Sequence, residues 1–125
     1  MAFYWTIDSR QRQIVATPEG EFTAKEFRDY LATISGAQIL DYRQLLDLSG
    51  AFPQISDEEA TQLGAYIRHQ HFTHSQSRLG PLAVVLPGQK TEPTARLLGF
   101  LATAPRLMRL FHERKLAIRW LVGLP

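Results

Sequence analysis

The chain has 125 residues, of which 45% are hydrophobic and 21% are charged, as is typical of one globular domain over residues 1–125. It contains no cysteine, which excludes disulfides, thiolate nucleophiles and cysteine-based zinc sites and fits a reducing cytoplasm. The net charge is only +2, so composition does not predict nucleic-acid binding. No apolar run reaches the roughly 20 residues of a transmembrane helix, and no signal peptide is evident. We therefore expect a cytoplasmic domain.

The first half of the chain predicts a hairpin, a helix and a buried strand. Polar residues around Ser9 separate two strands, and Pro18 and Gly20 end the second. Thr23 and Glu26 have the spacing of a capping box at a helix start, and Gly36 is the expected stop. The third strand is apolar on both faces, as in a parallel sheet. The predicted ranges are strands at 3–8 and 13–17, a helix at 23–36 and a strand at 42–48.

The second half predicts three further helices that alternate with two strands. Ser56 and Glu59 form a second capping box, Thr91 caps the next helix, and Pro105 ends it. Gly99 costs about 1 kcal/mol inside that helix relative to alanine, and we attribute it to a close approach of helix to sheet. The predicted ranges are a helix from residue 56, a polar loop at 73–78, strands at 81–86 and 107–111, and helices at 91–104 and 113–122. In the last helix we expect Leu116, Ala117, Trp120 and Leu121 to face the core.

The predicted element order is β-β-α-β-α-β-α-β-α. Strands that alternate with helices need right-handed crossovers and a mainly parallel sheet, and the opening hairpin makes that sheet mixed. The fold class is therefore α/β, with a mixed, mainly parallel five-stranded sheet and four helices. The strand at 107–111 carries Arg109 among its apolar residues, which favours a place at the sheet edge.

The element order, the sequence DLSG at residues 47–50 and the sequence FHERKLAIRWL at residues 111–121 resemble the SpoIIAA-like branch of the STAS fold. That branch includes the anti-sigma-factor antagonists and bacterial proteins of unknown function, some labelled STAS/SEC14-like by similarity to lipid-binding domains. The resemblance implies a non-catalytic regulatory module. It also implies a phosphorylatable serine at the start of the second helix, but here Asp57 stands at that position and Ser56 at the preceding aspartate.

The functional face is predicted from topology, because ligands and partners gather at the carboxyl ends of parallel strands. Ordinary turn chemistry is the alternative explanation for the aspartate, serine and glycines of this face. We expect Ser56 to act as a helix cap and not as a phosphosite, because three carboxylates already occupy that first turn and would repel a phosphate. The candidate binding residues are Asp47, Ser49, Gly50, Ser56, Asp57, Gly88 and His112.

Neither a metal site nor an active site is predicted. His69, His71 and His74 have ligand-like spacing, but His69 and His71 point to different helix faces and packing explains His71. Asp47, Ser49 and His112 could be assembled into a triad on paper, yet no G-x-S-x-G elbow supports one. We expect no cofactor and no enzymatic activity.

Two functions from different classes remain open. The first is a protein-interaction module that presents the start of the second helix and adjoining loops to a partner. The second is a binder of a lipid or other apolar molecule, in a pocket beneath the second and third helices where Gly64 and Gly99 leave room. A homodimer could form through the edge strand or through the aromatic residues 3–5. Nucleic acid is not an expected partner, because the basic C-terminal part lacks interleaved aromatic residues.

Overall fold

A computed structural model describes residues 2–73, 79–89, 91–104 and 106–124, with side chains left undescribed at residues 2 and 70–73. The predicted loop at 73–78 lies almost wholly outside the described residues, and the predicted helix stop at Pro105 lies outside them too. In chain order the elements are β1 (Ala2–Asp8), β2 (Gln13–Thr23), α1 (Ala24–Gly36), β3 (Arg43–Asp47), β4 (Ala51–Gln54), α2 (Asp57–Thr73), β5 (Leu82–Val85), α3 (Glu92–Leu101), β6 (Met108–Phe111) and α4 (Arg114–Val122).

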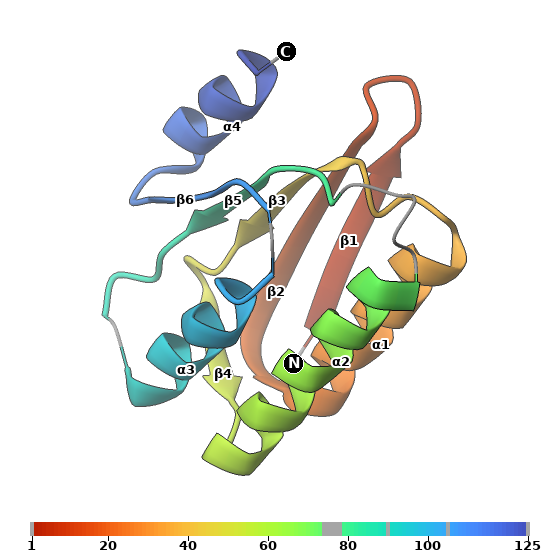
Figure 1. Cartoon of the computed structure of the whole chain (residues 1–125). Helices are drawn as coiled ribbons and strands as arrows, with labels where there is room; N and C mark the ends of the chain where they lie inside the picture. The colour runs from red at the N-terminus through yellow and green to blue at the C-terminus, as the bar shows by residue number, and fades with distance from the viewer. Residues whose placement is uncertain (1, 74–78, 90, 105, 125) are drawn as a thin grey trace.

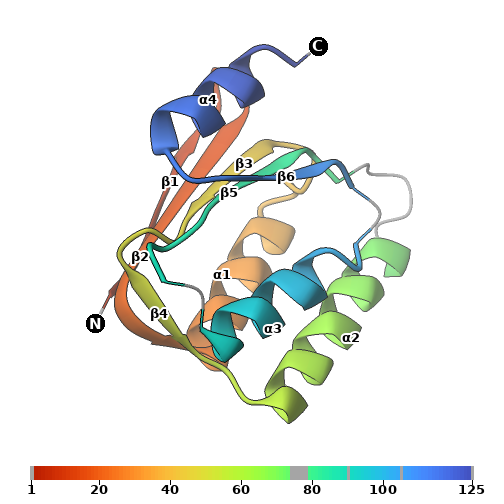
Figure 2. The same ribbon diagram turned by 90° about the vertical axis from the view of Figure 1, so that its left-hand side faces the viewer.

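The sheet has the order β1-β2-β3-β5-β6, with β4 attached to β2 outside this path. β1 and β2 are antiparallel, whereas β3, β4, β5 and β6 are each parallel to the strand they join. α1, α2 and α3 cover one face of the sheet and α4 lies on the other (Figures 1 and 2). The mixed, mainly parallel α/β fold is therefore confirmed, as is the edge position of the last strand.

The predicted count of five strands is wrong, because residues 51–54 form the short strand β4. Ala51 and Pro53 are buried while Phe52 and Gln54 are exposed, which is the alternation of a strand with one covered face. Pro53 made this stretch look like a loop, since proline cannot donate to a ladder. An edge strand tolerates it, and β4 is paired only with β2 among the described strands.

The predicted end of the second strand is also wrong, because β2 continues through Pro18 and Gly20 to Thr23. β3 pairs with residues 13–16 of β2, and β4 pairs with residues 20–23. Pro18 lies between these two paired stretches, where a missing N–H costs least. Gly20 adopts a positive φ of 68°, which favours glycine, and its N–H donates to the Gly50 carbonyl at 2.9 Å.

The core consists of two apolar clusters, one on each face of the sheet. Leu45 and Leu46 of β3 point to opposite clusters, which confirms burial on both faces of that strand. The larger cluster, under α1, α2 and α3, includes Phe22, Phe27 and Leu97, and Phe3 of β1 packs against the Phe27 ring. The smaller cluster, under α4, consists of Leu45, Ala83, Val85, Ala117 and Leu121.

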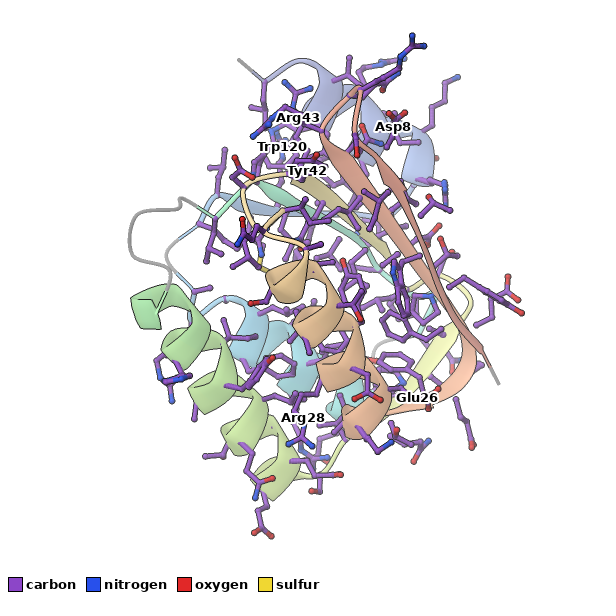
Figure 3. The ribbon with its side chains drawn as sticks, turned by 90° about the vertical axis from the view of Figure 1, so that its right-hand side faces the viewer. Asp8, Glu26, Arg28, Tyr42, Arg43 and Trp120 are labelled. Atoms are coloured by element: carbon purple, nitrogen blue, oxygen red, sulfur yellow. The ribbon has the colours of Figure 1, made fainter. Side chains whose placement is uncertain are left out.

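Three helix starts follow the predicted capping. Thr23 and Glu26 form a reciprocal capping box at α1, where Figure 3 labels Glu26. At α2 the Ser56 N–H donates to the Glu59 carboxylate at 3.0 Å, and the Glu59 N–H donates to the Ser56 hydroxyl at 3.1 Å. The Thr91 hydroxyl accepts from the Thr94 N–H at 3.4 Å at α3. Each cap satisfies backbone donors that have no partner inside the helix.

The inward face of α4 is predicted only in part. Ala117 and Leu121 are buried, and Trp120 packs against Phe111 with ring centroids 5.7 Å apart, but Leu116 is 43% exposed. α4 packs mainly over β5, β3 and β6, and fewer of its apolar residues are buried than its sequence predicts. At the other end of α4, the Arg43 guanidinium donates to the Leu124 carbonyl at 2.9 Å (Figure 3).

The interpretation of Gly99 as a close helix–sheet contact is wrong, because Gly99 is exposed and a Cβ there would meet nothing within 4 Å. Gly64 instead lies where α2 crosses α3, and a Cβ would be 3.5 Å from the Phe100 Cβ. The glycine at a truly close approach is Gly80, where a Cβ would overlap the Tyr42 carbonyl oxygen. The Gly80 N–H also donates to the Leu40 carbonyl at 2.9 Å.

Replacing Gly80 with alanine is expected to destabilise the protein by about 2 kcal/mol or more, because two backbone segments must separate. Gly99→Ala is the matched control, and it should stabilise the protein by up to about 1 kcal/mol through helix propensity. Urea unfolding monitored by tryptophan fluorescence measures both free energies. Equal effects of the two substitutions would contradict the close approach at Gly80.

Candidate functional site

A buried carboxylate stands at the carboxyl end of β3. Asp47 is only 5% exposed, and its Oδ1 accepts hydrogen bonds from the Ser49 N–H at 3.0 Å and the Ser49 hydroxyl at 2.6 Å. These bonds close the turn that leads from β3 to β4. A local turn closed by an aspartate side chain is the explanation that the sequence offers as an alternative to a binding role for Asp47.

The second oxygen of Asp47 binds α4. Arg114, the first residue of α4, donates from Nη1 to Asp47 Oδ2 at 2.9 Å, and the same nitrogen lies 3.5 Å from the Thr17 hydroxyl of β2. An arginine at a helix N-terminus opposes the helix dipole. The buried Asp47 charge explains its presence there, because an unpaired carboxylate at this depth would be costly.

The hydrogen bonds decide the protonation of Asp47. Burial acts to raise the pKa of this carboxyl, but the Ser49 donors and the Arg114 guanidinium outweigh it and lower the pKa below 3.8. Asp47 is therefore an anion at neutral pH with both oxygens occupied. Its hydrogen bonds hold the turn after β3 and the start of α4 in place.

The triad considered from the sequence does not form. The Ser49 hydroxyl donates its proton to Asp47, so it is not oriented toward an imidazole. The sheet register does place His112 at the same edge, since Asp47 pairs with Val85 and Val85 pairs with Phe111. His112 and Gly88 are exposed and follow the ends of β6 and β5. Asp47, Ser49, Gly88 and His112 thus share the edge that topology predicted.

Ser56 and Asp57 lie away from that edge, because β4 intervenes. Its 4 residues carry the chain roughly 13 Å along β2 at about 3.3 Å per residue. Gly50 stands where the chain leaves the edge, and its carbonyl is held by Gly20 of β2. The seven candidate residues therefore form two groups instead of one.

The start of α2 is fastened to α3 by Arg96. The Arg96 Nε lies 2.5 Å from an Asp57 carboxylate oxygen, and its Nη1 donates to the Ile55 carbonyl at 3.1 Å. Its Nη2 lies 3.5 Å from the Glu92 carboxylate one turn earlier in α3. Arg96 is three-quarters buried and joins the starts of both helices.

The sequence did not predict an exposed aromatic residue on β4, the strand that precedes the start of α2. Phe52 of β4 is 60% exposed, although phenylalanine is usually buried. In the parallel ladder it pairs with Glu21 of β2, which is also exposed. Glu58, the second residue of α2, is exposed and makes no ion pair with any described residue. We call Glu21, Phe52, Asp57 and Glu58 the β4–α2 face. The signal in the sequence is the alternation of apolar and other side chains over residues 51–54, which is typical of a short strand with one covered face.

The histidine cluster is described only in part. His69 lies in α2, the His71 side chain is not described, and His74 lies outside the described residues. Within the described part of the chain, no three His, Asp or Glu residues are grouped closely enough to hold a metal ion. The absence of a metal at this cluster stays a prediction.

Among described residues, no helix is long and apolar enough to cross a membrane.

Comparison with known proteins identifies the fold. The anti-sigma factor antagonist SpoIIAA in its unphosphorylated form superposes with a TM-score of 0.58 at 13% identity, over 98% of this chain and 100% of its own. The chain has the SpoIIAA-like fold. An uncharacterized DUF3478-family protein with a SpoIIAA-like fold, from Shewanella loihica PV-4, superposes with a TM-score of 0.57 at 15% identity, over 96% of this chain and 92% of its own. No protein-family model and no curated protein sequence matches the chain.

The SpoIIAA-like fold was expected from the order of elements and is confirmed. At these identities the likeness shows the fold alone. Residue roles in this chain therefore rest on its own geometry.

Asp47→Asn is expected to lower the free energy of unfolding at pH 7 by about 1–3 kcal/mol, because charged hydrogen bonds to Ser49 and Arg114 are lost. The folded-state pKa of Asp47 lies below its unfolded value. Its stabilisation is therefore complete above the unfolded pKa of about 3.9 and is lost as the pH falls through the folded pKa. Urea unfolding of both proteins between pH 7 and pH 2.5 should show the difference shrink.

Asp29→Asn is the matched control, because Asp29 is exposed and its pair with Lys25 spans 3.7 Å along one helix. Its loss should cost about 0.5 kcal/mol or less. A difference between wild type and Asp47→Asn that stays constant down to pH 2.5 would count against the charged role of Asp47.

Proposed function

We propose that this chain is a non-catalytic, cytoplasmic protein-interaction module that presents the β4–α2 face to a protein partner. The SpoIIAA-like fold supports this proposal, because SpoIIAA is an anti-sigma factor antagonist and so acts through another protein. The observation that carries the proposal is the exposure of Phe52 on β4, opposite the exposed and unpaired Glu21 of β2 in the ladder.

Phe52 has the properties of an interface anchor. Exposed aromatic side chains at the centre of a contact often carry much of the binding energy, and polar residues around them exclude water. Phe52 stands on a strand that is fixed by four registered residue pairs with β2. A rigid support of this kind lowers the ordering cost of binding.

The charge of the β4–α2 face favours a partner with basic residues. Arg96 compensates Asp57, but Glu21 and Glu58 have no ion-pair partner among the described residues. Their carboxylates would steer a complementary basic surface and add specificity. Figures 1 and 2 show β4 and the start of α2 at the end of the molecule that lies away from α4.

The partner contact is tested with the double variant Phe52→Ser and Glu58→Lys, used as bait beside the wild-type chain in extract of its native cells. We expect wild type to retain one protein in stoichiometric amount and the double variant to retain at least tenfold less. Loss of an anchor and reversal of a charge act together on that contact. Quantitative mass spectrometry measures the ratio.

Tyr4→Ser is the matched control, because Tyr4 is 57% exposed on β1 and lies outside the β4–α2 face. It should retain the partner as wild type does. Equal retention by the double variant would refute the proposed face. Capture of no protein at all would refute the interaction function.

Ser56 is expected to remain unphosphorylated in this module. Its hydroxyl already caps α2, and Asp57, Glu58 and Glu59 place three carboxylates in the first turn. A phosphate of about −2 charge would be repelled there. The intact mass of the protein isolated from its native cells should show no added phosphate, and stoichiometric phosphorylation of Ser56 would overturn this expectation.

A further inference from the structure

A partly enclosed cavity of about 40 Å³ lies inside the larger core cluster. It is not the pocket expected from the sequence, because Gly64 and Gly99 line an open outer groove between α2 and α3 instead. The cavity wall is mostly apolar, and half-buried residues of α1 and α2, among them Leu31 and Ile67, form part of it. Among the described residues, Tyr30, Ile34, Gln44, Leu46 and Arg106 also line it.

Two polar groups in this apolar wall have no hydrogen-bond partner among the residues that the structure describes. They are the Nε2 atom of Gln44 and the Nη2 atom of Arg106, and both atoms are buried. Gln44 is only 4% exposed. Both atoms are donors, so the cavity offers two N–H groups and calls for an acceptor.

The residues that carry the two donors are hydrogen-bonded to neighbouring backbone carbonyls. Arg106 Nε donates to the Gly80 carbonyl at 2.8 Å, and the Gln44 N–H donates to the next carbonyl, that of Pro81, at 2.9 Å. Gly80 itself is fixed by its close approach to Tyr42. The backbone at Gly80 and Pro81, just before β5, therefore fixes the positions of both Arg106 and Gln44.

Arg106 is a half-buried cation whose Nη2 atom is buried, and it has no counter-charge among the described residues. It forms no ion pair with any residue that the structure describes, and Tyr30 beside it is neutral because burial raises the pKa of its phenol. Burial lowers the pKa of Arg106 to about 10, so its guanidinium stays charged at neutral pH. A buried charge or donor left unpaired is costly, and an anion in the cavity would remove that cost.

We propose that this cavity binds a small aliphatic monocarboxylate, whose carboxylate accepts hydrogen bonds from Gln44 Nε2 and Arg106 Nη2. The apolar body of the ligand would lie among side chains such as Ile34 and Leu46. The two donors match the two oxygens of a carboxylate, whereas a phosphate would leave further acceptors without partners in an apolar wall.

The size of the cavity limits the ligand to a short chain. A single water needs about 10–15 Å³ of cavity space, so 40 Å³ holds about three water-sized groups. The carboxylate group and the adjoining carbon take up that space, and the remaining carbons of a three-carbon body reach toward the half-buried Leu31 and Ile67 in its wall. Long-chain fatty acids are excluded unless the helices move apart.

The probe is sodium butyrate, titrated calorimetrically into the full chain at constant ionic strength, with sodium chloride as the blank. We expect saturable binding with one site per chain. Butyramide, which has a similar shape but no charge, should bind at least tenfold more weakly. Equal affinity for butyrate and butyramide, or no saturable heat with butyrate, would overturn the proposal.

Two variants connect binding with the two donors. Gln44→Leu and Arg106→Met should each weaken butyrate binding at least tenfold, and thermal unfolding checks that each is folded. Gln44→Leu removes an unpartnered group and should fold even if Arg106→Met does not. Arg109→Met is the control, because Arg109 is an exposed arginine on β6 with its guanidinium over the Phe111 ring. Binding unchanged in Gln44→Leu would refute the assigned donors.

A crystal structure grown in butyrate supplies a direct readout. Density for a carboxylate between Gln44 and Arg106 supports the proposal, and density for ordered waters alone overturns it.

Tighter binding of dodecanoate than of butyrate would refute the short-chain limit. Phe52→Ser should bind butyrate as wild type does, because Phe52 does not line the cavity. Failure of the carboxylate proposal and failure of the partner proposal can therefore be distinguished.

Discussion

The fold depends on the length of β2. This strand of eleven residues pairs with β1 along one side and, in succession, with β3 and β4 along the other. Its first half completes the main sheet, and its second half extends past the end of β3 to hold β4. Gly20 supplies the bend between the halves, and its N–H binds the Gly50 carbonyl where β4 begins. The position of α2 follows, because α2 starts three residues after β4 ends.

Asp47 connects the end of β3 to the turn into β4 and to the start of α4. Its one carboxylate closes the turn into β4 through Ser49 and fastens the start of α4 through Arg114. A buried charge with this many donors is stable only if all of them stay in place. Loss of any one partner would therefore affect both the β4 branch and the helix on the opposite face of the sheet.

Local signals made most of the fold predictable. Capping pairs such as Ser56 with Glu59 lie three residues apart, and the apolar pattern of β3 is visible within seven residues. The failures concern features whose cause is distant in the chain. β4 exists because β2 reaches it, and the exposure of Leu116 depends on how α4 packs over β5, β3 and β6.

The candidate site was less predictable than the fold for the same reason. Asp47 and Arg114 are 67 residues apart, and no local pattern pairs them. The exposure of Phe52 depends on which face of β4 is covered, which is a tertiary property. The sheet edge with Asp47, Ser49 and His112 was accessible from topology alone, because parallel strands end together. Ser56 and Asp57 do not belong to this edge, because strand β4, which the sequence does not predict, separates them from it.

The two proposed sites share α2 but use different parts of it. Asp57 and Glu58 stand in its first turn, whereas Tyr66 and Ile67 line the cavity about nine residues later, roughly 14 Å along the helix axis. Arg96 fixes the first turn to α3, and Gly64 packs beside Phe100 between the two regions. A ligand in the cavity could therefore act on the partner face by moving α2 as a rigid body, or through α1, which lines the cavity and follows directly on β2. Any such coupling would be reciprocal, so a bound partner would change the affinity for the carboxylate by the same factor.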